Sequence, residues 1–199
     1  MLWHIPYYEK KITMESFKGR VVLDLDDLAS DSESNAMDIL FELKDRYPKF
    51  KVTLFTILGR WRNKELLKQI GKIKWVELAA HGYTHMTNAE VADWDKKKWY
   101  DVINEYENMG CFVQGFKAPN WEMSPLGYEV LKDCGWWVAV RSHQIPDVPV
   151  GAQYYCFETN LFGAHGHTWT LKPDLKDGRF MFSQSTNFSF VSRNIETKK

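Results

Sequence analysis

The sequence predicts an α/β protein with a parallel sheet. Three features indicate this class: short apolar, β-branched runs alternate with amphipathic segments of helical period, caps and turn residues separate them, and no repeat or composition break divides the 199 residues. A chain of this length is expected to form one domain, residues 1–199, with its own core. These patterns alone leave open whether the sheet is flat or closed into a barrel.

The first half of the chain contains three strand patterns, each followed by a helix pattern. Residues 19–27 are apolar and β-branched and end in acidic residues, which favours a strand. Residues 30–48 have Ser and Asp at the start and Pro at the end of a helical pattern. Further strands are expected at 49–58 and 73–81, and further helices at 63–72 and 87–110.

The second half continues the alternation. The helix expected at 124–135 has Ser124 as its N-cap, Pro125 in its first turn and Gly135 at its end. Strands are expected on both sides of this helix and beyond a Pro-rich link, at 111–119, 136–142, 153–159 and 160–167.

Polar residues collect where the predicted strands end. These positions carry Asp24, Asp26, Asp27, His81, His85, Lys117, Asn120, Trp121, His165 and His167. Because the carboxyl ends of parallel strands meet at one rim of a sheet or barrel, we expect these side chains to lie close together. The sequence therefore places a functional site at this rim.

Two histidines in the stretch HGYTH indicate a metal site. Imidazole nitrogens with one carboxylate describe a catalytic zinc or similar divalent centre. His81 and His85 can point the same way if a helical turn begins there, and Gly82 gives the loop conformational freedom. At the end of the first strand, Asp26 and Asp27 can both reach the cleft, one to bind metal and one to accept a proton. The alternatives are surface histidines at a helix start and aspartates that cap the next helix.

The motifs LDLDD, HGYTH, FKAPNW and AHGHTW occur in this order across residues 21–169. This ordered set resembles the polysaccharide deacetylases of the NodB-homology type, carbohydrate esterase family 4. The resemblance implies a distorted barrel of the (β/α)7 type. It also implies that Asp27, His81 and His85 hold a divalent metal, with zinc expected first. In the implied reaction Asp26 takes a proton from metal-bound water as this water attacks an acetyl carbonyl.

The resemblance makes a histidine of the last strand the acid that protonates the leaving amine. Both His165 and His167 suit this position, and the backbone of Tyr83 is a candidate to hold the oxyanion. The implied activity is that of a metal-dependent deacetylase, a hydrolase of carbon–nitrogen bonds other than peptide bonds. Its partner would be a carbohydrate, or another small substrate, with N-acetyl or O-acetyl groups.

The sequence departs from the family pattern in three places. Lys117 stands where the family usually has Arg, and could tune Asp26 as a single point charge or be a surface lysine. Leu28 and Ala29 replace the Gly-Pro that often follows the Asp pair. An Asp-x-x-x-Trp segment is absent before the last strand. Next to the motifs, the candidate substrate-binding residues are Asn120, Trp121 and Trp169. For the two tryptophans the alternative is core packing.

Composition excludes other classes of function. Lys plus Arg and Asp plus Glu number 26 each, which argues against a nucleic-acid partner. No apolar run approaches the roughly 18 residues of a membrane span, and the first residues do not resemble a secretory signal. We therefore expect a cytoplasmic protein without a membrane partner. A metal-dependent amidase for a small non-glycan amide and an inactive carbohydrate-binding relative remain as alternatives.

Overall fold

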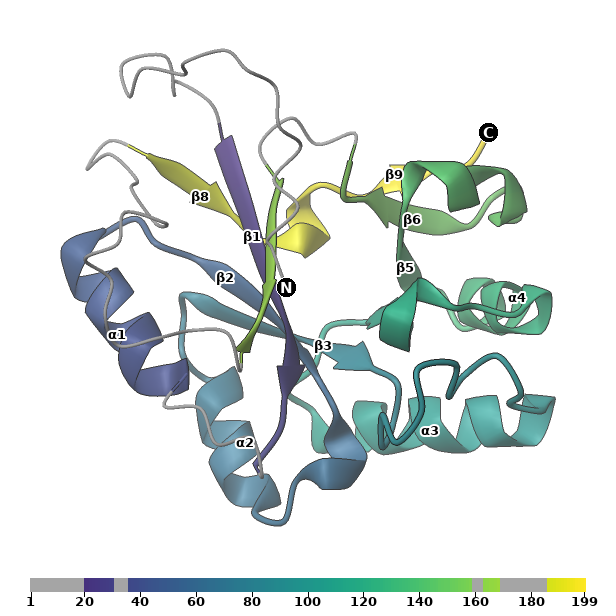
Figure 1. Cartoon of the computed structure of the whole chain (residues 1–199), viewed down its shortest axis with the longest axis horizontal. Helices are drawn as coiled ribbons and strands as arrows, with labels where there is room; N and C mark the ends of the chain where they lie inside the picture. Colours follow the sequence, from purple (N-terminus) through teal and green to yellow (C-terminus); the bar gives the residue numbers. More distant parts are fainter. Residues whose placement is uncertain (1–19, 31–35, 159–162, 169–185) are drawn as a thin grey trace.

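A computed structural model describes residues 20–30, 36–158, 163–168 and 186–199. In this part of the chain nine strands form one sheet, with the order β7-β1-β2-β3-β4-β5-β6-β9, and β8 pairs with the start of β1 (Figure 1). All pairs are parallel except β6 with β9.

The strands are β1 (Arg20–Leu28), β2 (Val52–Thr56), β3 (Val76–His81), β4 (Gly115–Lys117), β5 (Trp137–Val140), β6 (Gln153–Cys156), β7 (Gly163–His167), β8 (Asn187–Ser189) and β9 (Glu196–Thr197). The α-helices are α1 (Ala36–Arg46), α2 (Lys64–Gly71), α3 (Lys96–Met109) and α4 (Pro125–Asp133). Short 3₁₀ helices are η2 (Leu58–Arg60), η3 (Pro119–Trp121), η4 (Ser142–Asp147) and η7 (Val191–Arg193).

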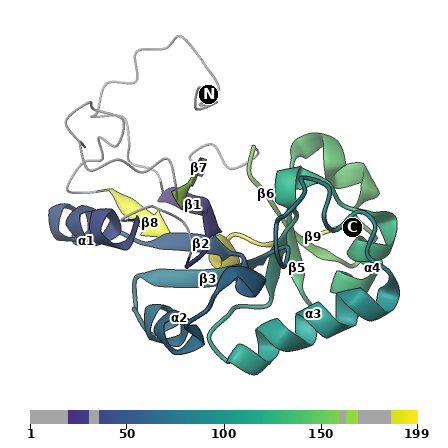
Figure 2. The same cartoon turned by 60° about the horizontal axis from the view of Figure 1, so that its bottom comes forward.

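The α/β class and the distorted barrel of the (β/α)7 type are confirmed. The sheet is curved, and α1, α2, α3 and α4 follow one another along its outer side (Figure 2). Within the described residues no pairing joins β6 to β7, so the barrel stays open there. The strands β8 and β9 lie in a region for which the sequence patterns predicted no element. None of the helices in the described ranges is long and apolar enough to cross a membrane.

The helix α3 is shorter than the expected helix at 87–110. It begins at Lys96, where the Asp95 side chain accepts a hydrogen bond from the backbone N–H of Lys98 at 2.7 Å, and it ends at Gly110 with φ 66°. The residues before Asp95 form turns instead. They place the Glu90 carboxylate under the loop that follows β3, where it accepts backbone hydrogen bonds. This local interaction competes with helix formation.

Alternate residues of the strands face opposite sides of the sheet. On β1, Leu23 and Leu25 pack in the core between sheet and helices, and Val22 belongs to the smaller inner core. The inner face also carries the buried polar side chains of Asp24, Asp26, Thr53, Glu77, His81 and Lys117. The candidate site is therefore built on the inner face of the sheet.

Candidate active site

The end of β1 brings two neighbouring aspartates to the rim. The register between β1 and β2 shifts between Leu25 and Leu28, and Asp27 has φ 66°. This irregularity breaks the strict alternation of side chains, because an extra residue re-aims those beside it. Asp26 is buried, at 3% exposure, and both carboxylates lie beside histidine or lysine nitrogens. They therefore do not act as caps of the next helix.

The HGYTH loop joins two imidazole rings at the end of β3. His81 is the last strand residue, and its ring centroid lies 5.1 Å from that of His85. The expected helical turn between them is wrong: Gly82 has φ 61° and His85 has φ 51°, so two left-handed residues turn the chain. A Cβ atom at Gly82 would lie 2.5 Å from Oε2 of Glu90. Glycine is therefore required at this position.

Asp27 and the two histidines have the spacing of metal ligands. Asp27 Oδ1 lies 3.4 Å from His81 Nε2 and 3.5 Å from His85 Nε2. Tetrahedral ligands at zinc bond lengths stand about 3.3 Å apart. His81 Nδ1 lies 2.9 Å from the carbonyl oxygen of Lys117, so the Nδ1 proton is donated there and Nε2 faces the aspartate. The donor set therefore fits a divalent metal ion.

The charge around His81 also favours a cation. Burial acts to lower the pKa of His81, but Asp26 and Asp27 outweigh it and raise this pKa above its ordinary value. The two carboxylates therefore create a negative potential next to His81 Nε2, which would attract a cation.

Glu90 holds the HGYTH loop in shape, a function that the sequence patterns did not reveal. Its carboxylate accepts backbone N–H bonds from Tyr83 at 2.9 Å, Thr84 at 2.8 Å and His85 at 3.0 Å. Burial acts to raise the pKa of Glu90, but these bonds and that of the Thr84 hydroxyl lower it below its usual range. Because the Tyr83 amide donates to Glu90, it is not free to donate to an oxyanion as well.

Lys117 is a buried cation between two aspartates. Its side chain is 1% exposed, and Nζ lies 2.8 Å from Asp26 Oδ1 and 3.0 Å from Asp24 Oδ1. The ammonium also lies over the rings of Trp121, at 4.2 Å, and Phe55, at 4.8 Å. The surface-lysine alternative is therefore wrong, and Lys117 fixes the position of Asp26.

Asp24 is a buried carboxylate in LDLDD to which the family resemblance gives no role. It is adjacent to His165 in the register of β1 and β7, and its Oδ1 lies 2.6 Å from His165 Nδ1. Burial acts to raise the pKa of Asp24, but Lys117 and His165 lower it to about 2. The available signal was its spacing: Asp24 stands two residues before Asp26, on the same face of an extended strand.

The two histidines of β7 contact different aspartates. His165 Nε2 lies 3.6 Å from Asp26 Oδ2, and its side chain is 17% exposed. His167 Nδ1 lies 2.8 Å from Asp27 Oδ2, and its side chain is 39% exposed. His165 thus adjoins the Asp26–Lys117 pair, whereas His167 adjoins the candidate metal ligands.

Comparison with known proteins gives structural neighbours only. No known family profile matches the sequence, and no curated protein matches it. A family 4 carbohydrate esterase from Streptomyces lividans, solved in complex with acetate, has a TM-score of 0.52 and 17% identity over 77% of this chain and 81% of its own. A family 4 acetyl xylan esterase from Clostridium thermocellum, solved in complex with a cobalt ion, has a TM-score of 0.54 and 13% identity over 88% and 89%.

The fold is that of the family 4 carbohydrate esterases. The resemblance based on motif order is thus confirmed at the level of the fold. Sequence identity this low leaves the activity of this chain to its own site residues.

Two consecutive residues in this carbohydrate esterase fold have left-handed backbone at the rim. Asn120 has φ 51° and Trp121 has φ 64°, which is an unfavourable conformation for a bulky side chain. The Trp121 carbonyl accepts a hydrogen bond from Gln144 Nε2 at 2.6 Å, and its ring lies 5.7 Å from that of His165. Asn120 is exposed, and its side chain donates to Glu122 at 2.7 Å. Trp121 therefore forms a wall beside His165, while Trp169 lies outside the described residues.

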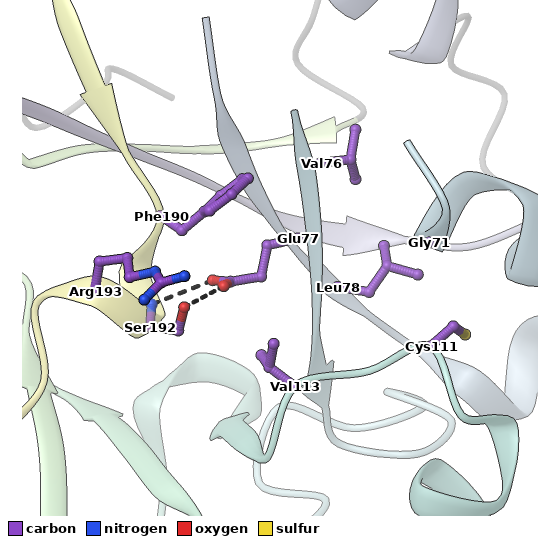
Figure 3. Close-up of a pocket in the computed structure, with 9 residues that line it drawn as sticks. All are labelled: Gly71, Val76, Glu77, Leu78, Cys111, Val113, Phe190, Ser192 and Arg193. Carbon is purple, nitrogen blue, oxygen red and sulfur yellow. Dashed lines mark hydrogen bonds between the residues drawn. The ribbon is translucent and has the colours of Figure 1, made fainter. Parts of the chain in front are cut away.

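A separate pocket of about 260 Å³ lies around the start of β3 (Figure 3). Its central polar group is Glu77, whose carboxylate accepts hydrogen bonds from Ser192 (Figure 3). It also accepts one from Thr53 Oγ1. Glu77 precedes His81 by four residues, about 13 Å along an extended strand. The pocket therefore does not include the Asp and His residues of the candidate site.

Proposed function

We propose that this chain is a metal-dependent deacetylase that removes N-acetyl, or O-acetyl, groups from a carbohydrate. One observation carries the proposal: Asp27, His81 and His85 have metal-ligand spacing directly beside Asp26, which Lys117 holds. The esterase fold supports the substrate class. The neighbours also support it, since one binds acetate and the other is an acetyl xylan esterase.

Asp27, His81 and His85 would hold the metal. A divalent ion in such a site polarises a carbonyl and lowers the pKa of coordinated water to about 7. We expect zinc first, and the cobalt ion in the structure of the acetyl xylan esterase supports a divalent ion of this size. His167, hydrogen-bonded to the second oxygen of Asp27, would orient that carboxylate.

Asp26 would serve as the general base. Its Oδ1 pairs with Lys117, while its Oδ2 lies 3.9 Å from His81 Nε2, on the side of the metal ligands. This geometry supports the proposal that one carboxylate oxygen accepts a proton from the attacking water. The ion pair with Lys117 keeps the other oxygen in place.

His165 would serve as the general acid. Its Nδ1 is hydrogen-bonded to Asp24 and its Nε2 lies next to Asp26, so Nε2 would take up the proton that Asp26 accepts and pass it to the leaving nitrogen. An amide nitrogen leaves poorly as an anion, which makes this protonation necessary. Trp121, beside His165, would pack against a sugar ring, with Asn120 and Trp169 as further substrate contacts.

The first test is bound metal and acetate release. We expect about one equivalent of a divalent ion in the purified protein, and none in a His81→Ala, His85→Ala double variant. Acetate should be released from N-acetylated sugar oligomers or acetylated xylan by the wild type alone. An amide without a sugar tests the substrate class. Failure to bind zinc or cobalt, even when they are added, would overturn the proposal.

A further inference from the structure

We propose that Asp24 is a positioning residue that holds His165 as the Nδ1–H tautomer, so that Nε2 can take up a proton and pass it to the leaving group. This inference rests on the proposed function. Asp24 belongs to LDLDD, but the family resemblance gives it no role, and its position is supported by contacts of its own.

The contact between Asp24 and His165 fixes which nitrogen carries the proton. An ionised carboxylate only accepts hydrogen bonds, so His165 Nδ1, at 2.6 Å from Asp24 Oδ1, is the protonated nitrogen. The opposite nitrogen, Nε2, then points to Asp26 at 3.6 Å. The ring is also held between those of Trp121, at 5.7 Å, and Phe157, at 5.4 Å. The imidazole is therefore oriented by a hydrogen bond and by two aromatic neighbours.

Lys117 shares the same oxygen of Asp24. Its Nζ lies 3.0 Å from Asp24 Oδ1 and 3.1 Å from His165 Nδ1. Asp24 thus connects the proposed acid, His165, with the lysine that holds the proposed base, Asp26. Because two donors converge on one buried carboxylate, loss of its charge would disturb His165 directly.

A second metal ion is the competing explanation for this cluster. Asp24, Asp26 and His165 also bring ligand atoms within 4.8 Å of one another. However, the Lys117 ammonium already lies within 3.0 Å of both carboxylates. The cation of this cluster is therefore the lysine, and the carboxylate of Asp24 is left to orient the histidine.

The proposal predicts a dependence on the leaving group. When the carbon–nitrogen bond of an N-acetyl group breaks, its electron pair stays on nitrogen, which takes a proton from His165 Nε2. Nε2 first receives this proton from Asp26, which accepted it from the attacking water. When 4-nitrophenyl acetate is cleaved, the phenolate leaves without a proton. A defect in His165 should therefore slow the amide far more than the activated ester.

The decisive variant is Asp24→Asn, assayed on both substrates. We expect kcat/KM to fall about 100-fold for the N-acetyl sugar and to stay within about threefold for 4-nitrophenyl acetate, with bound metal unchanged. In a His165→Ala background, Asp24→Asn should add less than about threefold. Equal losses on both substrates, or a full loss in the His165→Ala background, would overturn the proposal.

Glu77→Gln is the matched control. Glu77 is another buried carboxylate on the inner face, and the register aligns Asp24 with Thr53 and Thr53 with Glu77. This variant should leave both rates unchanged, which separates loss of a buried charge from loss of the His165 contact.

A measurement that needs no activity completes the test. Long-range ¹H–¹⁵N spectra of the full chain, with His165 assigned from the His165→Ala variant, should show Nδ1 protonated in the wild type and altered in Asp24→Asn. An Nε2-only proton in the wild type would overturn the inference even if the variant did not fold. If the protein binds no metal and releases no acetate, these spectra still test the Asp24 contact separately from the proposed function.

Discussion

The inner face of the sheet carries two buried polar clusters that differ in how their charges are matched. In the first, a single carboxylate, Glu77, accepts hydrogen bonds from neutral donors on Thr53 and Ser192. In the second, Lys117 pairs with both Asp24 and Asp26. Beside this second cluster, Asp27 lies among three histidines.

This difference separates a structural cluster from a reactive one. Both carboxylates, Asp24 and Glu77, are buried and lie in one row of the sheet. Neutral donors satisfy Glu77 and connect β2, β3 and η7. In the other cluster, Asp24 and Asp26 share one lysine while Asp27 lies among histidines, which leaves negative charge next to imidazole nitrogens. Burial is common to both clusters, whereas the excess of charge marks the one that can bind a cation and move protons.

The largest effect should follow from removing the shared cation. Lys117→Met leaves two buried carboxylates without their partner, and we expect the metal-free protein to lose about 3–5 kcal/mol of unfolding free energy. Glu77→Gln, where only neutral hydrogen bonds change, should lose about 1–3 kcal/mol. Urea unfolding in the presence of a chelator measures both. A smaller loss for Lys117→Met than for Glu77→Gln would contradict the distinction between the clusters.

Bound metal should stabilise the protein through Asp27 and its histidines, and not through the Glu77 cluster. At a free zinc concentration 100 times the dissociation constant, we expect about 2.7 kcal/mol of added stability, reversed by a chelator. Asp27→Asn should remove this gain, and Glu77→Gln should retain it. Thermal unfolding with and without zinc measures the shift. An equal shift in Asp27→Asn would place the metal elsewhere.

Glu90, like Glu77, accepts hydrogen bonds from neutral donors, but it lies beside the candidate active site. Glu90→Gln should lose about 1–3 kcal/mol near pH 7, because three loop amides lose a charged acceptor. The folded-state pKa of Glu90 lies below its ordinary value of 4.5, so this stabilisation is complete above pH 4.5 and is lost as the pH falls through the folded-state pKa.

The stability difference between wild type and Glu90→Gln should therefore shrink in acid. Urea midpoints at pH 7 and below pH 4 measure it. Zinc affinity should also fall about 10- to 100-fold, since Glu90 orients the backbone of His85. A constant difference across this pH range would contradict the assignment.

The smallest effect should come from the aromatic wall. Trp121→Leu removes a ring beside His165, and we expect KM for the sugar substrate to rise about threefold to tenfold with kcat nearly unchanged. Phe190→Leu is the control near Glu77: its ring also lies under a lysine, Lys51, at 5.2 Å. Steady-state kinetics with N-acetylated sugar oligomers compares the two. A rise in KM for both variants would remove the distinction between the two regions.

The local sequence pattern predicts most elements, because strands and helices each have a characteristic period of apolar residues. The strands β1 to β7 and the helix ends at Gly110 and Gly135 agree with this prediction. The start of α3 does not, because Glu90 bonds to a preceding loop and competes with the helix. The strands β8 and β9 are short and pair only with distant segments, so local pattern carries little signal for them.

By itself the sequence determined the fold class and the residue types that meet at the rim, since parallel strands place their carboxyl ends together. The tertiary structure alone decided which of these groups pair. Lys117 is buried between Asp24 and Asp26, His165 contacts Asp24, and His167 contacts Asp27. The contacts of Asp24, for example, join β1 to residues 93 and 141 positions away in the sequence. The geometry of these pairs depends on register and on the left-handed turn at Asp27. Spacing along one strand carries no information about the partner strand, and only the folded sheet brings these charges together.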